Sequence, residues 1–222
     1  GLFMRGGKWH ARELPFTPPF MDKRGGLVLS MGSFMTWASQ KVMEAGLMVM
    51  PGTPVAEPLF AGDAVVGVRL ADQGVEKDGT PMEGAFMPGM DVKAALTVVA
   101  DGPVGAVGRA LDAKFGLPKG HHRYDWGVGM KAVVQLPETC ELKPGTVIHT
   151  LGFPEPEIFG FLYVYPNRTA SLGIFVAPWQ DTPVRTTYRY LQHWMQHPYI
   201  WRHIKGGKLL SWGAKSLQES GQ

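Results

Sequence analysis

Short runs of hydrophobic and β-branched residues, separated by Gly, Pro and Asn, dominate the second half of the chain. The four clearest runs are YDWGVGMKAVVQLP, GTVIHTLGF, IFGFLYVYP and ASLGIFVAP. Their length and the turn residues between them predict four strands of an antiparallel sheet. Residues 205–215, KGGKLLSWGAK, predict a turn followed by one more strand.

After these four runs, the spacing of apolar residues predicts a helix from Thr186 to Gln196, which His197-Pro198 should end. Its apolar face is formed by Tyr188, Leu191, Trp194 and Met195. We expect Leu191, Trp194 and Met195 to pack against the sheet, leaving Arg185, Arg189 and Gln192 outward. The alternative is a helix lying in a membrane interface with its aromatic face in lipid.

In the first half, strand-like and helix-like segments alternate after about 25 residues that are typical of loops. Residues 25–30 predict a short strand, and Ser33 is expected to cap a helix that ends at Gly46. Residues 47–50 predict another strand, and Ala61-Gly62-Asp63 the turn of a hairpin. The segment 71–90 is long for a connection in a compact domain, which indicates a functional or family-specific insertion.

The segment LTVVADGPVGAVGRAL, residues 96–111, is the strongest local pattern in this half. Residues 96–100 predict a strand buried on both faces, Asp101-Gly102 stops it, and a helix follows. Such a turn in α/β proteins receives a phosphate or a cofactor edge, because helix amides point outward and glycine permits close approach. An ordinary strand-to-helix turn is the alternative. The glycines at 102, 105 and 108 do not form the G-x-G-x-x-G dinucleotide motif.

These patterns predict an α/β first part, residues 1–117, and an α+β second part, residues 118–222. The second part should contain a mixed or antiparallel sheet with a packed helix.

Composition excludes several classes of protein. The chain has 222 residues, of which 45% are hydrophobic and 18% charged, as expected for a folded chain. Its net charge of +3 comes from scattered Lys and Arg, which argues against nucleic-acid binding. The single Cys140 cannot form an internal disulfide or supply a cysteine-ligated cluster. The sequence has no run long enough for a spanning helix, so any membrane contact should be peripheral.

Several motifs together resemble one family of redox enzymes. They are GVEKDGTP (74–81), FMPGM (86–90), VVADG (98–102), KFGLP (114–118), GVGMK (127–131), KPGTVIHTLGFP (143–154), FLYVYP (161–166), HP (197–198) and GGKLLSWGAKSLQESG (206–221). From about Phe16 onward the chain resembles the middle of the electron transfer flavoprotein–ubiquinone oxidoreductase family. The resemblance implies part of an FAD-binding domain, of the glutathione-reductase-like or aromatic-hydroxylase-like type, over 1–117 and a quinone-side domain over 118–222.

The resemblance also implies a function. Family members pass electrons from reduced electron transfer flavoprotein to a membrane quinone, ubiquinone or menaquinone, using FAD and a 4Fe-4S cluster. They are peripheral on the inner or cytoplasmic membrane, at the bacterial cytoplasmic face or the mitochondrial matrix side. This sequence contains neither the G-x-G-x-x-G opening nor a four-cysteine segment, so we expect an internal fragment that is itself inactive. A geranylgeranyl-reductase-like flavoprotein and a non-catalytic module that binds a partner or lipid remain alternatives.

On the FAD side, the resemblance assigns roles to residues that match family positions. The turn formed by Ala100, Asp101 and Gly102 should lie beside the FAD. The other expected FAD-side residues are Ser30 near the phosphate–ribose region, Val55 and Ala56 with backbone groups near the adenine, and Arg109 facing the phosphates or an internal carboxylate. The alternative for Ser30 is a polar residue that simply precedes a helix, and the alternative for Arg109 is a surface ion pair.

On the quinone side, Phe159, Gly160 and Phe161 match the family's segment beside the quinone ring. The family has a tyrosine, two glycines and a serine there, and this chain has a shorter segment with one glycine. A ring can stack on the bare backbone of Gly160 or lie along Phe159 and Phe161, but not both unless a bulge bends the strand. Without the resemblance, Phe161, Tyr163 and Tyr165 would be core residues of a strand.

Histidines offer a second possible site in the chain. His193, His197 and His203 lie on or after one predicted helix, where an i, i+4 pair can bind zinc, but no acidic third ligand is near. Packing or surface roles are favoured, as are solvated loop positions for His121-His122. We expect no metal site and no protein nucleophile, because a flavin carries the redox chemistry.

Overall fold

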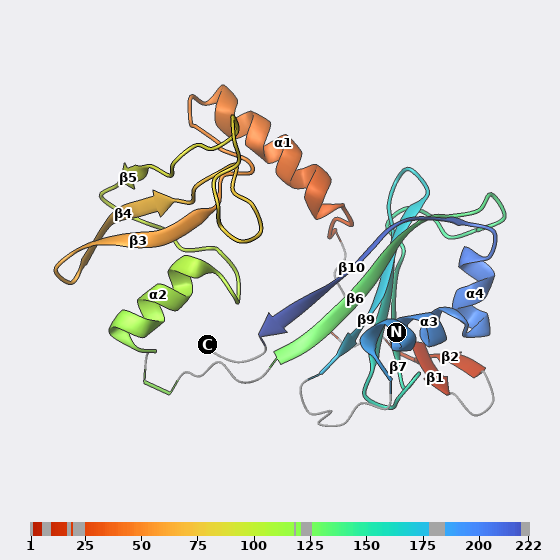
Figure 1. Cartoon of the computed structure of the whole chain (residues 1–222). Coiled ribbons are helices and arrows are strands. Elements are labelled where there is room, and N and C mark those ends of the chain that lie inside the picture. Colours follow the sequence, from red (N-terminus) through yellow and green to blue (C-terminus); the bar gives the residue numbers. More distant parts are fainter. Residues whose placement is uncertain are drawn as a thin grey trace. The chain divides into compact units, whose positions relative to one another are not determined.

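The structure is a computed structural model that describes residues 2–5, 10–16, 19, 25–117, 119–120, 126–177 and 185–218, the first of these ranges by its backbone alone. Contacts divide the chain into two compact units (Figure 1). We call residues 1–37 with 123–221 unit 1, and residues 38–122 unit 2. The first 37 residues thus group with the second part of the chain. The functional division at residues 117 and 118 stays a prediction.

Unit 1 contains a seven-stranded sheet in the order β10-β6-β9-β8-β7-β1-β2. Its strands are β1 (Leu2–Arg5), β2 (His10–Glu13), β6 (Trp126–Gln135), β7 (Val147–Leu151), β8 (Phe159–Val164), β9 (Thr169–Val176) and β10 (Lys208–Gln218). All neighbours are antiparallel except β1 and β7. The five later strands match the prediction. The expectation of a loop before residue 25 is wrong, because β1 and β2 extend the edge of the sheet.

Two helices cover one face of this sheet (Figure 1). Helix α3 (Thr187–Met195) begins after Thr186, whose side chain caps it by accepting a hydrogen bond from the amide of Arg189. Helix α4 (Pro198–Ile204) follows directly, with proline in its first turn where the missing N–H costs nothing. The sequence pattern ended at His197-Pro198 and did not predict α4.

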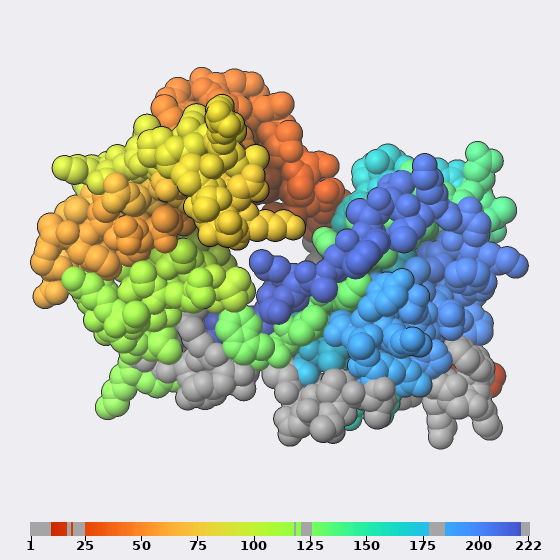
Figure 2. All heavy atoms as spheres, in the orientation of Figure 1, coloured from red at the N-terminus to blue at the C-terminus, as the bar shows by residue number. Residues whose placement is uncertain are grey.

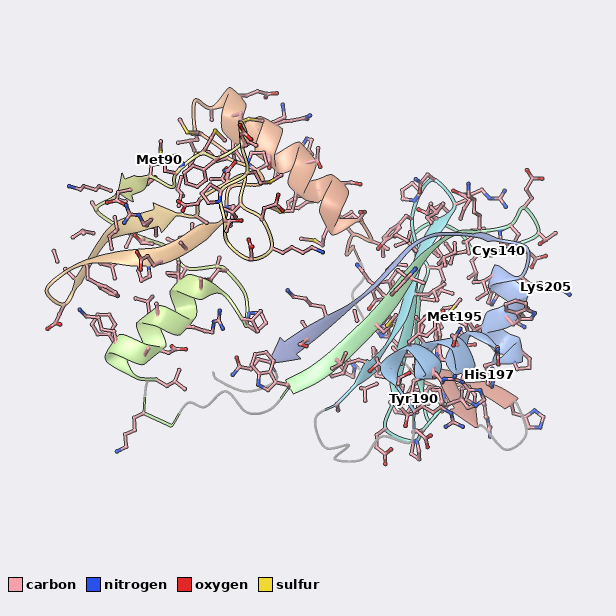
Figure 3. All side chains as sticks on the ribbon, in the orientation of Figure 1. Met90, Cys140, Tyr190, Met195, His197 and Lys205 are labelled. Carbon is pink, nitrogen blue, oxygen red and sulfur yellow. The ribbon has the colours of Figure 1, made fainter. Side chains whose placement is uncertain are left out.

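The core of unit 1 lies between these helices and the sheet. Side chains at alternate positions of β6, β8 and β9 meet Tyr190, Leu191 and Trp194 of α3 and Ile200 of α4. Figure 3 labels Tyr190, Met195 and His197 along this layer and Cys140 in the loop after β6. Trp194 and Leu191 are buried, as predicted, while Tyr188 is 48% exposed and Tyr190 takes its place.

Unit 2 contains a three-stranded antiparallel sheet, β3 (Val55–Ala61), β4 (Ala64–Leu70) and β5 (Asp91–Lys93), in that order. The predicted hairpin around residues 61–63 is therefore present. Helix α2 (Ala106–Phe115) packs against β3. Helix α1 (Met31–Glu44) begins in unit 1 and ends in unit 2, and none of its residues is buried. Its cap is Ser30 rather than the predicted Ser33, since Ser30 precedes the helix and accepts from the amide of Ser33.

Three predicted strands are wrong. Residues 25–30, 47–50 and 96–100 form no ladder, and Leu27, Met48, Leu96 and Val98 are each about four-fifths exposed, at 86%, 82%, 79% and 80%. A strand needs a neighbour for its backbone donors and acceptors, and no described segment pairs with these three. None of the described helices combines the length and hydropathy that a membrane span requires.

Candidate functional site

The Asp101-Gly102 turn is open and lies directly before α2. Gly102 has φ +75°, a left-handed conformation that glycine adopts without strain, and no atom would lie within 4 Å of an added Cβ. Ala100, Asp101 and Gly102 are all exposed. The turn therefore leaves room for a group to approach its backbone closely.

The Asp101 carboxylate caps α2. One of its oxygens accepts hydrogen bonds from the amides of Val107 at 2.9 Å and Gly108 at 3.2 Å. A side chain on Gly105 would collide with this carboxylate, so a substitution there would displace the cap. The expectation that amides at this helix end point outward toward a phosphate is therefore wrong for Val107 and Gly108, because the protein's own carboxylate occupies them.

The other FAD-side residues lie in different elements. Ser30 caps α1 through its hydroxyl, which is the structural role left open above. Val55 and Ala56 begin β3, where the pairing register skips Ala56, so its backbone lies at an irregularity of the ladder. Arg109 is exposed, and its Nε donates to the carbonyl of Gly105 at 3.4 Å.

The sheet of unit 1 has a second face, turned away from α3 and α4, on which rings gather. We call its five half-buried ring side chains the aromatic face: His149 from β7, Phe159, Phe161 and Tyr163 from β8, and Phe175 from β9. They share this face because side chains alternate along a strand, and their neighbours Leu162 and Ile174 point into the core. The result is a largely apolar surface held by a rigid sheet.

Glycines on neighbouring strands let these rings lie close to the backbone. Phe161 is in register with Gly173 of β9, and a Cβ on Gly173 would lie 2.7 Å from the tip of the Phe161 ring. Phe175 covers Gly127 of β6 in the same way. The tips of these two rings therefore lie over the bare backbone of the adjacent strand.

Gly160 does not belong to this face. An added Cβ would collide with the indole nitrogen of Trp194 and the hydroxyl of Thr150, which themselves form a buried hydrogen bond of 2.8 Å. The pairings of β8 with β7 and β9 also show no register shift, so no bulge turns the glycine outward. The idea that a planar ring stacks on Gly160 is therefore wrong, because the core fills that side. Stacking along Phe159 and Phe161 remains geometrically open.

The aromatic face also holds a polar pair that the sequence did not reveal. The Nε2 atom of His149 lies 2.9 Å from the Tyr163 hydroxyl, within hydrogen-bond distance. Burial lowers the pKa of His149 and raises the pKa of Tyr163, so both are neutral near pH 7. Only the register of β7 on β8, which places His149 opposite Phe161, could have indicated the pair.

The histidines considered for zinc pack instead. His193 and His197 lie 4.9 and 5.1 Å from the ring of Phe153, and His203 lies 5.4 Å from Tyr199, measured between ring centroids. The described residues contain no cluster of three or more metal-ligating side chains. His121-His122 lies outside the described residues.

Comparison with known sequences identifies the family. Residues 126–217 match the family described as "ETF-QO, ubiquinone-binding". The chain is 35% identical over 216 residues to the mitochondrial electron transfer flavoprotein-ubiquinone oxidoreductase of Arabidopsis thaliana, covering 95% of the chain. The chain belongs to the electron transfer flavoprotein–ubiquinone oxidoreductase family. The Pseudomonas aeruginosa member is 30% identical over 93% of the chain, and the human mitochondrial member 31% over 94%. The chain spans about a third of these relatives' length, 34%, 38% and 34% respectively.

Solved structures show the same fold in more distant proteins. A geranylgeranyl bacteriochlorophyll reductase-like protein from Thermoplasma acidophilum superimposes with a TM-score of 0.60 at 16% identity, over 84% of this chain and 41% of that one. The myxobacterial FAD-dependent halogenase CndH gives 0.61 at 15% identity, over 99% of this chain and 47% of that one. At these identities the likeness concerns the fold, a mixed α/β arrangement.

Proposed function

We propose that this chain forms the FAD- and quinone-facing part of an enzyme that passes electrons from reduced electron transfer flavoprotein to a membrane quinone. The observation that carries the proposal is the aromatic face, which lies within the residues that match the ubiquinone-binding family. A surface of mostly apolar aromatic side chains suits a planar ring that needs few polar contacts. The relatives' names supply the electron donor and the quinone.

The turn in unit 2 fits one edge of an FAD. The open backbone at Ala100, Asp101 and Gly102 suits a flat ring or sugar chain lying against it, with Ser30, Val55, Ala56 and Arg109 as further contacts. The amides of Val107 and Gly108 are capped, so the pyrophosphate must be held elsewhere. When bound, FAD would accept electrons from the donor and release them to the quinone. The 4Fe-4S cluster of the family would take its ligands from outside this chain, which has one cysteine.

On the quinone side, the proposal assigns Phe159 and Phe161 as the wall of the ring site. Both rings are half-buried on the aromatic face, and the tip of the Phe161 ring lies over Gly173. Gly160 supports this wall from the core side rather than touching the acceptor. We place the enzyme at the membrane surface, as a peripheral protein, since its acceptor is a membrane quinone.

Flavin content tests the FAD side. In the protein expressed from its complete gene, Gly102→Val should lower flavin occupancy, because a β-branched residue at φ +75° is strained and fills the open turn. Gly79→Val is the matched control, since Gly79 also has a positive φ and open surroundings but lies in the 71–90 loop. Full flavin retention by Gly102→Val removes the turn from the cofactor site. A colourless, flavin-free wild-type protein defeats the flavoenzyme proposal and favours a non-catalytic module.

Steady-state kinetics test the quinone side. Phe159→Leu and Phe161→Leu should each raise the KM for a short-chain ubiquinone while flavin reduction by electron transfer flavoprotein persists. Phe86→Leu, an exposed position in the 71–90 loop, controls for the loss of a ring. An unchanged KM in both aromatic-face variants moves the acceptor site elsewhere. A wild-type protein that reduces a prenyl chain and no quinone favours the geranylgeranyl-reductase alternative.

A further inference from the structure

The hydrogen-bonded pair of His149 and Tyr163 lies on the same face as the proposed ring wall. His149 is directly opposite Phe161 across the β7–β8 ladder, and Tyr163 is two residues further along β8 on the same side. The Phe161 and Tyr163 rings are stacked with centroids 5.0 Å apart and planes at 28°. The His149 ring lies 4.9 Å from Phe159. The pair is therefore built into the wall itself.

The contrast with the opposite face of the sheet indicates a role beyond packing. The hydrogen bond between Trp194 and Thr150 is buried in the core, where it satisfies two polar groups that water cannot reach. His149 and Tyr163 are only half-buried, unlike Trp194 and Thr150. Of the five side chains of the aromatic face, they are the two that carry a nitrogen or oxygen atom.

We infer that Tyr163 and His149 act on the carbonyl oxygen of the planar acceptor, Tyr163 as the proton donor and His149 as the residue that positions and reprotonates it. This inference rests on the proposed function, because it needs a quinone against Phe159 and Phe161. Reduction of a quinone to a quinol consumes two electrons and two protons. The flavin supplies the electrons, and one proton passes through the pair.

The proton transfer is balanced within the pair. As electrons arrive, the Tyr163 O–H bond breaks and an O–H bond forms on the acceptor oxygen, leaving an electron pair on the tyrosine oxygen. The Nε2–H proton of His149 moves to that oxygen across the 2.9 Å contact, while Nδ1 takes a proton from water. His149 is thereby neutral before and after the step. The second proton reaches the other carbonyl oxygen from water.

Two electron acceptors separate this role from a structural one. A short-chain ubiquinone takes up protons when reduced, whereas the ferricenium ion accepts one electron and no proton. In the FAD-loaded protein from the complete gene, Tyr163→Phe should lower kcat with the quinone about 100-fold, the usual size of a lost general acid. Its kcat with ferricenium should stay within about twofold of wild type. His149→Gln should show the same selective loss, to a smaller extent.

Tyr188→Phe is the matched control, because it removes a tyrosine hydroxyl from an exposed position on α3, at the opposite face of the sheet. It should leave turnover with both acceptors unchanged. The solvent deuterium isotope effect on quinone reduction should also change in Tyr163→Phe, which a loss of packing alone would not produce.

Each result decides the inference. Unchanged quinone turnover in either Tyr163→Phe or His149→Gln overturns it, and so does an equal loss with quinone and ferricenium, which would indicate damage to the fold or to flavin reduction. A wild-type protein that reduces ferricenium but no quinone overturns the proposed function instead. The two failures are thus distinguishable.

Discussion

The two units differ in how much of their apolar surface they bury. Unit 1 packs α3 and α4 onto one face of a seven-stranded sheet and buries a continuous core. In unit 2, Leu70 and Val107 are the large apolar side chains that the structure shows as buried, while Leu47, Met48 and Leu96 are largely exposed. The difference follows from connectivity. Antiparallel strands pair through short hairpins within the chain, whereas the apolar segments 47–50 and 96–100 have no such neighbour in a hairpin and form no ladder.

This comparison has a functional consequence. The aromatic face is supported from behind by the core of unit 1, so its rings are held by contacts within the described residues. The FAD-side turn is supported by the α2 cap and by the contact of α2 with β3. We therefore expect substitutions in the two units to differ in size and in what they disturb.

The largest expected effect concerns Trp194, whose side chain is fully buried and donates to Thr150. Trp194→Ala should lower the free energy of unfolding of unit 1 by about 3–5 kcal/mol, through lost burial and an unfilled cavity. Trp212→Ala, on β10 and 66% exposed, is the matched control and should cost far less. Urea denaturation measures both. Equal costs for the two variants would mean that α3 does not anchor the core.

Gly160→Ala should have the next largest effect. Its Cβ would enter the space of the Trp194 indole, and overpacking of this kind costs about 1–3 kcal/mol. Gly213→Ala on β10 is the control, because no atom lies within 4 Å of the added methyl group. Denaturation should show a loss only for Gly160→Ala. If quinone affinity fell while stability stayed at the wild-type value, our placement of Gly160 in the core would be wrong.

Acid should destabilise unit 1 before unit 2. Burial lowers the pKa of His197 and His203 below the ordinary 6.5, so the unfolded chain binds more protons as the pH falls. For each of these histidines, the free energy of unfolding should fall by up to about 1.4 kcal/mol per pH unit. The fall begins near pH 6.5 and ends at the pKa that the histidine has in the folded protein. In unit 2, hydrogen bonds from Thr80 lower the pKa of Asp78 from 3.8, so its contribution is lost only in stronger acid. Tryptophan fluorescence between pH 7.5 and 5 tests this, and a flat profile would contradict it.

The smallest expected effect lies in unit 2. Asp101→Ala removes the cap of α2 and should cost about 1 kcal/mol. Hydrogen exchange should be faster at the amides of Val107 and Gly108, with unit 1 unaffected. Glu83→Ala, at an exposed carboxylate in the 71–90 loop, is the control. Unchanged protection of both amides would show that another group caps the helix.

The sequence predicted elements whose signals are local. The hairpin strands of unit 1 and the apolar stripe of α3 followed from alternation, turn residues and helical period. It did not predict β1 and β2, because short polar edge strands such as HARE form only where a sheet edge receives them. The sequence pattern also predicted a strand at residues 96–100 wrongly, because an apolar run indicates burial but does not indicate which segment it pairs with.

The sequence predicted only part of the candidate site, because local motifs do not specify how strands and helices pack. The family motifs indicated the Asp101-Gly102 turn and the segment 159–161, and the strand period left two options for the ring. Only the packing of Trp194 decides between them, because it fills the side of Gly160. The pair of His149 and Tyr163 depends on strand register, which no local pattern of residues specifies.

The exposed edge of the sheet in unit 1 differs from its interior. Strand β10 runs along the surface as a strip of mostly exposed residues, including Leu209, Trp212 and Leu217 (Figure 2). Among the described strands β10 pairs with β6 alone, and most of its residues are exposed, so it contributes pairing to β6 and little burial. The aromatic face lies on interior strands, where both neighbours restrain each ring.

The ring-over-glycine arrangement makes the shape of the acceptor surface adjustable from a distance. A methyl group at Gly173 would press on Phe161 and on the backbone of Met130, so the ring would have to tilt away from the sheet. Position 173 on β9 therefore sets the height of a ring carried by β8, without itself facing a bound molecule. We therefore expect the thickness of the acceptor that fits to depend on the residues at positions 173 and 161 together. A larger side chain at either position would need a smaller one at the other.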